Sequence, residues 1–305
     1  MKKLSFSVTP VKLIKNDKGL SFGTGFFYQA AWGNENCIFL ITNYHVITGI
    51  KTEERKTKQP EGDSISFYYH IDKNDPKPVV EIKMPIFTKD GQAIWLEHNN
   101  SKVDVIAIPM LFSLPAPPKW HTIRKSLNDS EAGFSPCDPI TIVGYPKGFL
   151  DSVNALPIYK TGNIASEYEY DFDGDPCFIV DVAAFSGNSG SPVFSIRKNA
   201  QIASQKIILQ APGETIDFLG IYSAGMIVVR GHKIPIREIY NNPRGSHGII
   251  TDLDLQLGVV WKAKLIEEII EQGSFTNYKK IVEKYIKEGG FKFKITRGLK
   301  IEEDK

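Results

Sequence analysis

Residues 186–194 read Ser-Gly-Asn-Ser-Gly-Ser-Pro-Val-Phe, with Ser189 at the centre of a glycine-flanked turn. Apolar runs at 177–180 and 192–194 lie on either side of this turn. Glycines allow a tight turn and close backbone approach, so the N–H groups of Gly187 and Ser189 can point to one spot beside the Ser189 hydroxyl. Acyl transfer needs a nucleophile next to two such donors. An ordinary turn of a β protein is the alternative for this segment alone, because Gly, Ser and Asn are common turn residues.

A serine attacks a carbonyl only when a base takes its proton and a third group orients the base. His45 ends an apolar run that begins at Cys37, and Asp104 opens the β-branched run 103–108. A carboxylate in such a strand is costly to bury unless it is hydrogen-bonded, and a histidine Nδ1–H would satisfy it and fix the ring tautomer. Each residue alone has a structural interpretation. Their order along the chain, His, Asp and Ser at the edges of strand-like runs, favours a catalytic triad.

The chain resembles the chymotrypsin/trypsin-like serine peptidases over about residues 18–270, most closely the bacterial intracellular or HtrA-like branch. The segments that carry the resemblance, in the family's order, are 23–26, 42–46, 104–108, 142–148, 160–164, 181–192 and 219–225. About 35 residues follow position 270, too few for the PDZ domain of HtrA proteins, so the resemblance concerns the protease part alone.

This resemblance implies an all-β fold of two six-stranded antiparallel β-barrels with a C-terminal helical extension. It also implies a serine endopeptidase that cleaves peptide bonds through an acyl-enzyme and needs no cofactor. Ser189 would be the nucleophile, His45 the general base and Asp104 the group that orients the base. The backbone N–H groups of Gly187 and Ser189 would form the oxyanion hole.

The substrate pocket is expected to involve Ala183, Tyr222 and Ser223. In the family the residue six positions before the nucleophile lines the pocket base, and here it is Ala183. A trypsin-like preference requires a carboxylate at that position. The resemblance therefore implies a small or medium apolar P1 side chain, with Tyr222 narrowing the pocket further.

Two positions in the nucleophile turn depart from the family pattern. Ser191 replaces a glycine, and serine tolerates unusual φ values less well than glycine. Asn188 stands where many secreted members carry an aspartate that pairs with a newly cleaved N-terminus. Activation through such an amine is therefore not expected, and the bacterial branch shares the Gly-Asn-Ser sequence.

Composition is that of an ordinary globular protein. The 305 residues are 42% hydrophobic with a formal net charge of +2, so no nucleic-acid or membrane partner is indicated. The sequence has no apolar run of 18 residues, so no transmembrane helix is predicted. The first residues do not resemble a signal peptide. The odd count of three cysteines, none beside His45 or Ser189, favours a reducing compartment and so the bacterial cytoplasm.

We predict an N-terminal lobe over residues 1–115, a C-terminal lobe over 116–270 and a basic extension over 271–305. The Pro-rich run 114–118 would connect the lobes. Insertions at 197–214 and 230–248 would wall the cleft or bind a regulatory protein partner, with surface decoration as the alternative for each. The basic extension is a second candidate surface for a partner, with a solvated edge as its alternative.

Periodicity changes near the C-terminus. Apolar spacing predicts an amphipathic helix over 260–270, a second helix over 277–287, and an edge strand over 291–296. Members of the family that this chain resembles end their second barrel with an amphipathic helix like the one predicted over 260–270.

Other functional interpretations stay open. A catalytically silent relative would use the same fold to bind peptides. An α/β-hydrolase would require Gly-x-Ser-x-Gly between a strand and a helix, and Ser191 breaks that pattern. A cytoplasmic protease also needs restraint, so regulation by a partner, by narrow specificity or by a loop that distorts the oxyanion hole is expected.

Overall fold

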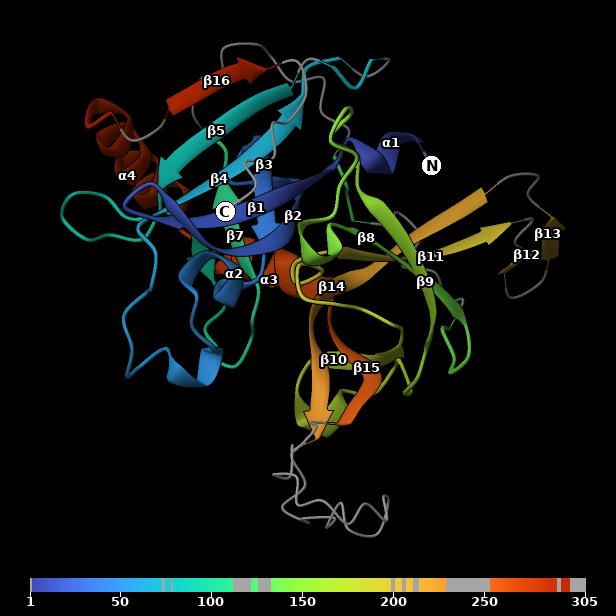
Figure 1. Cartoon of the computed structure of the whole chain (residues 1–305). Helices are drawn as coiled ribbons and strands as arrows, with labels where there is room; N and C mark the ends of the chain where they lie inside the picture. The colour runs from blue at the N-terminus through green and yellow to red at the C-terminus, as the bar shows by residue number, and fades with distance from the viewer. Residues whose placement is uncertain are drawn as a thin grey trace, which may run out of the picture.

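The structure is a computed structural model in which strands dominate two lobes (Figure 1). It describes residues 2–72, 75–77, 79–111, 122–125, 133–198, 201–204, 207–210, 214–228, 253–289 and 292–296. Short helices and turns connect the strands, and the longest helices follow the last strand of the second lobe.

An eight-stranded sheet in the order β16-β5-β4-β1-β2-β3-β7-β6 builds the N-terminal lobe. Its strands are β1 (Val8–Lys15), β2 (Lys18–Trp32), β3 (Glu35–Thr42), β4 (Ser64–His70), β5 (Val79–Pro85), β6 (Leu96–Glu97), β7 (Ile106–Pro109) and β16 (Lys292–Thr296). All of these pairings are antiparallel. The strands alternate side chains across the sheet, so Val11, Leu13, Leu40 and Phe67 enter one buried cluster.

The C-terminal lobe is a closed barrel in the order β10-β15-β14-β11-β8-β9. Its strands are β8 (Pro139–Gly144), β9 (Ile158–Ile164), β10 (Cys177–Asp181), β11 (Pro192–Lys198), β14 (Glu214–Val228) and β15 (Leu253–Lys262). Because the barrel is closed, each of its six strands pairs with a neighbour on both sides. A hairpin of β12 (Gln201–Ser204) and β13 (Ile207–Gln210) lies within the insertion predicted at 197–214.

The predicted mostly-β architecture is confirmed, and one of its two six-stranded barrels is confirmed as closed. In the N-terminal lobe the described strands form the eight-stranded sheet instead, and a second closed barrel is not confirmed. The outer edge of β5 in this sheet is occupied by β16, which comes from the far end of the chain. Sheet closure depends on such long-range pairing, which the local pattern of a strand does not specify.

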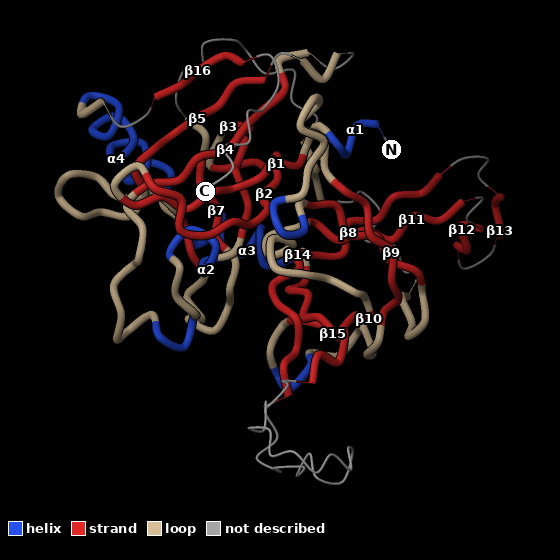
Figure 2. Tube along the Cα trace, in the orientation of Figure 1, coloured by secondary structure: helices blue, strands red, loops and turns tan. Residues whose placement is uncertain are grey.

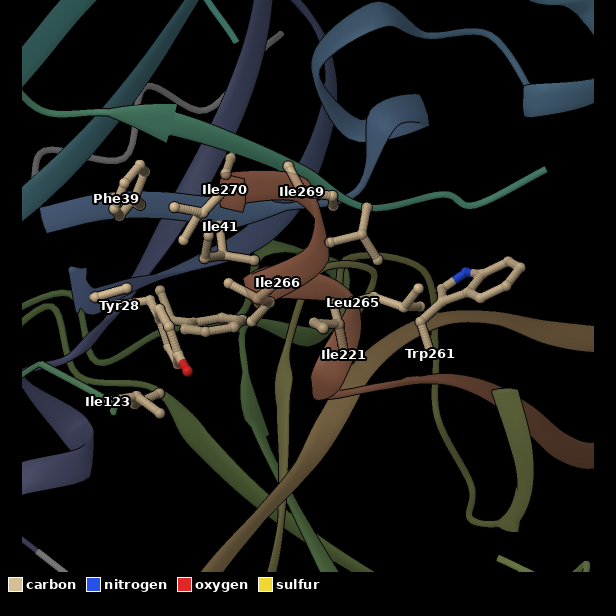
Figure 3. Close-up of a cluster of buried hydrophobic side chains, with 14 of the residues drawn as sticks. Tyr28, Phe39, Ile41, Ile123, Ile221, Trp261, Leu265, Ile266, Ile269 and Ile270 are labelled. Atoms are coloured by element: carbon tan, nitrogen blue, oxygen red, sulfur yellow. The ribbon is translucent and has the colours of Figure 1, made fainter. Parts of the chain in front are cut away.

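Helix α3 (Lys264–Gln272) lies at the junction of the lobes. Figure 3 shows Ile266 beside Tyr28 and Ile41 of the N-terminal lobe, and Leu265 beside Ile221 and Trp261 of the barrel. The helix is amphipathic, so one apolar face can meet both lobes.

The predicted C-terminal helices and edge strand are present, with one correction. The first helix begins at Lys264, because Val260 and Trp261 belong to β15. The second, α4 (Phe275–Lys287), begins at an N-cap serine, Ser274, whose side chain accepts from the N–H of Asn277. Figures 1 and 2 show β16 returning to the N-terminal lobe beside β5.

Some predicted segments lie outside the described residues, namely the connector at 114–118 and the insertion at 230–248. In the part of the chain that is described, no helix is long and apolar enough to cross a bilayer.

Candidate active site

The pairing of β3 with β7 brings His45 and Asp104 together. Thr42 stands opposite Ile106 in this antiparallel pair, so the segments that follow Thr42 and precede Ile106 meet at the same end. Immediately after β3 the chain enters the short helix α2 (Tyr44–Thr48), which carries His45 in its first turn. Gly49, with φ of 77°, ends this helix and donates its N–H to the His45 carbonyl.

The Asp104 carboxylate accepts three hydrogen bonds. Its Oδ2 is 2.6 Å from His45 Nδ1 and accepts the Ser223 hydroxyl at 2.6 Å, while Oδ1 accepts the backbone N–H of His45 at 3.1 Å. Asn43 donates its side-chain amide to the Asp104 carbonyl at 2.5 Å. The buried carboxylate is therefore satisfied, and the imidazole plane is held by a charge-assisted hydrogen bond.

The turn that carries Ser189 is attached to the N-terminal lobe by Thr24 of β2. The Thr24 N–H donates to the Ser189 carbonyl at 2.8 Å, and its hydroxyl donates to the Gly187 carbonyl at 2.7 Å. Thr42 in turn donates its hydroxyl to the Thr24 carbonyl at 2.6 Å. Because Thr42 ends the strand that leads to His45, this chain of bonds fixes the serine turn relative to the histidine helix.

Gly23 lies where the His45 helix and the Ser189 turn come close together. A Cβ at this position would lie 2.6 Å from the side chain of Val46, the neighbour of His45, and 3.2 Å from the Ser189 carbonyl oxygen. The structure thus brings the three predicted residues to one place. Among the described residues, however, no hydrogen bond joins the Ser189 hydroxyl to the His45 ring. Such contacts are often long before substrate binds.

The amide groups of Gly187 and Ser189 donate to no acceptor within the described ranges. The Ser186 carbonyl accepts the N–H of Lys147 at 2.6 Å. Because a peptide group is planar and trans, the Gly187 N–H points away from Lys147. Two donors beside Ser189 are therefore left for a ligand.

The His45 pKa is raised above its usual 6.5. Burial opposes the charged ring most strongly, but the Asp104 charge and its hydrogen bond together outweigh burial and the repulsion from Lys51. With Nδ1 paired to Asp104, Nε2 is the ring nitrogen that can exchange a proton with a ligand.

Asn188 and Ser191, the two residues of the turn that depart from the family pattern, are both buried. Ser191 is not among the residues with positive φ, so its side chain causes no backbone strain there. Its hydroxyl fits because the facing residue is Gly144, where a Cβ would lie 2.0 Å from the Ser191 Oγ. The Asn188 side-chain amide has no hydrogen-bond partner among the described residues.

The three predicted pocket residues differ in environment. Ala183 is exposed, whereas Tyr222 and Ser223 on β14 are buried. The Tyr222 ring lies against Gly258, where a Cβ would be 2.3 Å from its Cε2, and its hydroxyl is 3.9 Å from a Cβ built on Gly225. Because these glycines pair across β14 and β15, the ring occupies the space that they leave open.

Sequence reasoning missed the contributions of Thr24 and Asn43, and it assigned Ser223 to the pocket without its bond to Asp104. Thr24 and Asn43 both lie in the quoted motifs 23–26 and 42–46. Their polar side chains inside apolar runs were the available signal, since buried polar groups need partners.

A family model described as the trypsin-like peptidase domain matches residues 23–203. Among solved structures, the chain resembles a serine endoprotease from Yersinia pestis, with 12% identity and a TM-score of 0.47 over 89% of this chain. It spans 64% of the length of that protein. It also resembles an inactive form of Rv3671c from M. tuberculosis H37Rv, with 15% identity and a TM-score of 0.42, over 88% of this chain and 87% of the other. No curated protein matches.

Proposed function

Because this chain belongs to the trypsin-like peptidase family, we propose that it is a serine endopeptidase with Ser189, His45 and Asp104 as its catalytic triad. The observation that carries this proposal is the 2.6 Å contact between His45 Nδ1 and Asp104 Oδ2 beside the Ser189 turn. The family match agrees with the enzyme class predicted from the motifs.

In the proposed reaction the Ser189 hydroxyl attacks a peptide carbonyl and its proton passes to His45 Nε2. The protonated ring, stabilised by Asp104, then gives this proton to the leaving amine as the C–N bond breaks. Water then attacks the resulting ester as His45 takes a proton from it, and the ring gives this proton to the Ser189 oxygen as the acid product leaves. No step requires a cofactor.

Negative charge develops on the carbonyl oxygen in both halves of the reaction, and the Gly187 and Ser189 amides are the groups that would stabilise it. Two observations support this role of the amides. Neither amide donates to a described group, and the Ser186 carbonyl points toward Lys147. Donors already oriented need no rearrangement when charge forms, which makes them effective.

We propose a small or medium apolar P1 side chain. Ala183 supplies no carboxylate that could pair with a basic P1 side chain. The Tyr222 ring occupies the space beside Gly225 and Gly258 and so would limit the depth of the P1 pocket. A library cleavage profile dominated by Lys or Arg at P1 would contradict this preference.

Cytoplasmic location in a bacterium and control by a protein partner belong to the same proposal. The partner would bind the insertions at 197–214 and 230–248 or the basic extension. The excess of lysines over carboxylates from 277 to 300 supports an acidic partner for that extension.

A fluorophosphonate probe tests the proposed function directly. We expect covalent labelling of the wild-type protein at Ser189, identified by mass spectrometry of the labelled peptide, and no labelling of Ser189→Ala or His45→Ala. A folded wild-type protein that neither labels nor cleaves any peptide of a diverse library would favour the catalytically silent peptide-binding alternative.

The pH dependence follows from the raised pKa of His45. Only the neutral ring accepts the Ser189 proton, so kcat/KM is expected to fall as pH drops through this pKa. Because the shift is upward, the acid limb should lie above the ordinary value of 6.5. Measuring kcat/KM from pH 5 to 9 checks this, with the melting temperature at each pH as the control for unfolding. An acid limb centred below 6.5 would show that Asp104 does not control the ring.

A further inference from the structure

Two lysines converge on one exposed aromatic ring beside the nucleophile turn. Lys147 Nζ lies 5.1 Å and Lys160 Nζ 4.8 Å from the centre of the Phe185 ring, and 47% of Phe185 is exposed. Neither lysine forms an ion pair with a carboxylate among the described residues. The ring face attracts both ammonium groups, but it carries no net charge to neutralise them.

Lys147 also adopts a backbone conformation that a lysine does not favour. Its φ and ψ are 50° and 29°, in the left-handed region where Gly and Asn are the usual residues. Strained non-glycine residues concentrate at functional sites. The backbone conformation of Lys147 is an observation independent of its contact with the Phe185 ring.

The Lys147 backbone touches the proposed oxyanion turn. Its N–H holds the Ser186 carbonyl, and a Cβ on Gly187 would lie 2.8 Å from the Lys147 nitrogen. At the next residue, a Cβ on Gly148 would contact the ring of Phe22 on β2 at 3.8 Å. The segment 147–148 thus contacts both the proposed oxyanion turn and the N-terminal lobe.

Tyr222 of the proposed P1 pocket lies at the other end of this turn, where Gly190 donates its N–H to the Tyr222 carbonyl of β14. With the acyl half of a substrate along β14, the leaving half would extend toward the end of the turn that Lys147 contacts. We propose that Lys147 and Lys160, held around Phe185, bind an acidic side chain on the leaving-group side of the scissile bond. This inference rests on the proposed function and adds a substrate class to it.

Matched peptides test the inference. One series carries Glu and the other Gln at P1′, P2′ or P3′, with the same apolar residues before the cleaved bond. We expect the Glu-to-Gln ratio of kcat/KM to exceed one at one of these positions and to fall about two- to fivefold for each lysine replaced, in Lys147→Gln, Lys160→Gln and the double variant. The ratio should also decline in 0.5 M NaCl, because salt screens exposed charges.

The control is Lys15→Gln/Lys89→Gln in the N-terminal lobe, which removes the same charge from two exposed positions outside every proposed binding surface and should keep the wild-type ratio. Lys147→Arg should restore the preference that Lys147→Gln removes. Because each ratio is taken within one protein, a general loss of activity cancels.

A ratio of one in the wild-type protein at all three positions, or a ratio that the lysine variants do not change, would overturn the inference. The same peptides are also titrated into Ser189→Ala protein by fluorescence anisotropy. A Glu preference in binding that depends on both lysines supports the inference even without hydrolysis, and equal binding of Glu and Gln peptides overturns it. Failure of the proposed function is separate, since it appears as absence of fluorophosphonate labelling.

Discussion

Replacing Asp104 with asparagine is expected to lower kcat for peptide hydrolysis about 10,000-fold in a protein that remains folded. The reason is the pattern of donors around the carboxylate. Oδ1 accepts the His45 backbone N–H, whereas Oδ2 faces His45 Nδ1 and the Ser223 hydroxyl. A backbone N–H can only donate, so the amide oxygen of the introduced asparagine must remain at the Oδ1 position and its NH₂ group must face the ring.

An NH₂ group beside His45 Nδ1 favours the tautomer with its proton on Nε2. That nitrogen can then no longer take the Ser189 proton, although every heavy atom stays in place. The Ser223 hydroxyl adapts, because it can accept a hydrogen bond as well as donate one. The loss should therefore appear in kcat, measured with a quenched fluorescent peptide, while the melting temperature changes little.

Ser223→Ala is the matched control, because it removes one bond to Asp104 and leaves the carboxylate charged. We expect a loss of only about tenfold, the worth of one hydrogen bond to a charged group. In a His45→Ala background, Asp104→Asn should cost nothing further, since Asp104 acts through the ring. More than a tenth of wild-type activity in Asp104→Asn would contradict the proposed role of this residue.

The sequence pattern indicated His45 and Asp104 as candidates because each lies just beyond the end of a strand, His45 after β3 and Asp104 before β7, and alternating apolar residues mark such strands. The Ser189 turn could be recognised for the same reason, because glycines and small polar residues interrupt two apolar runs. The sequence did not reveal the hydrogen bonds that join these segments. Thr24 reaches the Ser189 turn across more than 160 residues, and Ser223 reaches Asp104 across 119. Such contacts depend on how the lobes dock.

The same limit explains the errors in the fold. Val260 and Trp261 fit a helical spacing, yet pairing with Tyr222 and Ile221 of β14 extends the strand through them. The apolar spacing of a few residues does not distinguish a helix from a strand, so pairing with a neighbouring strand decides the structure. The edge strand at β16 was predicted from alternation, but alternation contains no information on which sheet it joins. That partner is β5, which belongs to the N-terminal lobe and lies far earlier in the chain.

Gly187→Ala is expected to lower kcat about 100- to 1,000-fold, the usual effect of losing one oxyanion donor. Gly187 has φ of 93°, and a Cβ there would lie 2.5 Å from the Tyr145 carbonyl oxygen and 2.8 Å from the Lys147 nitrogen. Both contacts are with backbone atoms, which cannot rotate aside as a flexible side chain does. The Ser186–Gly187 peptide must therefore turn, and its N–H leaves the direction in which the carbonyl oxygen develops charge.

Gly174→Ala separates this effect from simple backbone strain. Gly174 has a comparable φ of 78°, and a Cβ there meets nothing within 4 Å. A Cβ in the left-handed region costs about 1 kcal/mol by itself, so Gly174→Ala should lose a few degrees in melting temperature. Gly187→Ala should lose more, because its Cβ also meets backbone atoms. Only Gly187→Ala should lose activity. Its affinity for a peptide boronate, which forms a tetrahedral adduct on Ser189, should fall by a factor similar to the loss in kcat, since the same amide stabilises both. Equal losses of activity in the two variants would mean that strain alone, and not the position of the Gly187 amide, accounts for the defect.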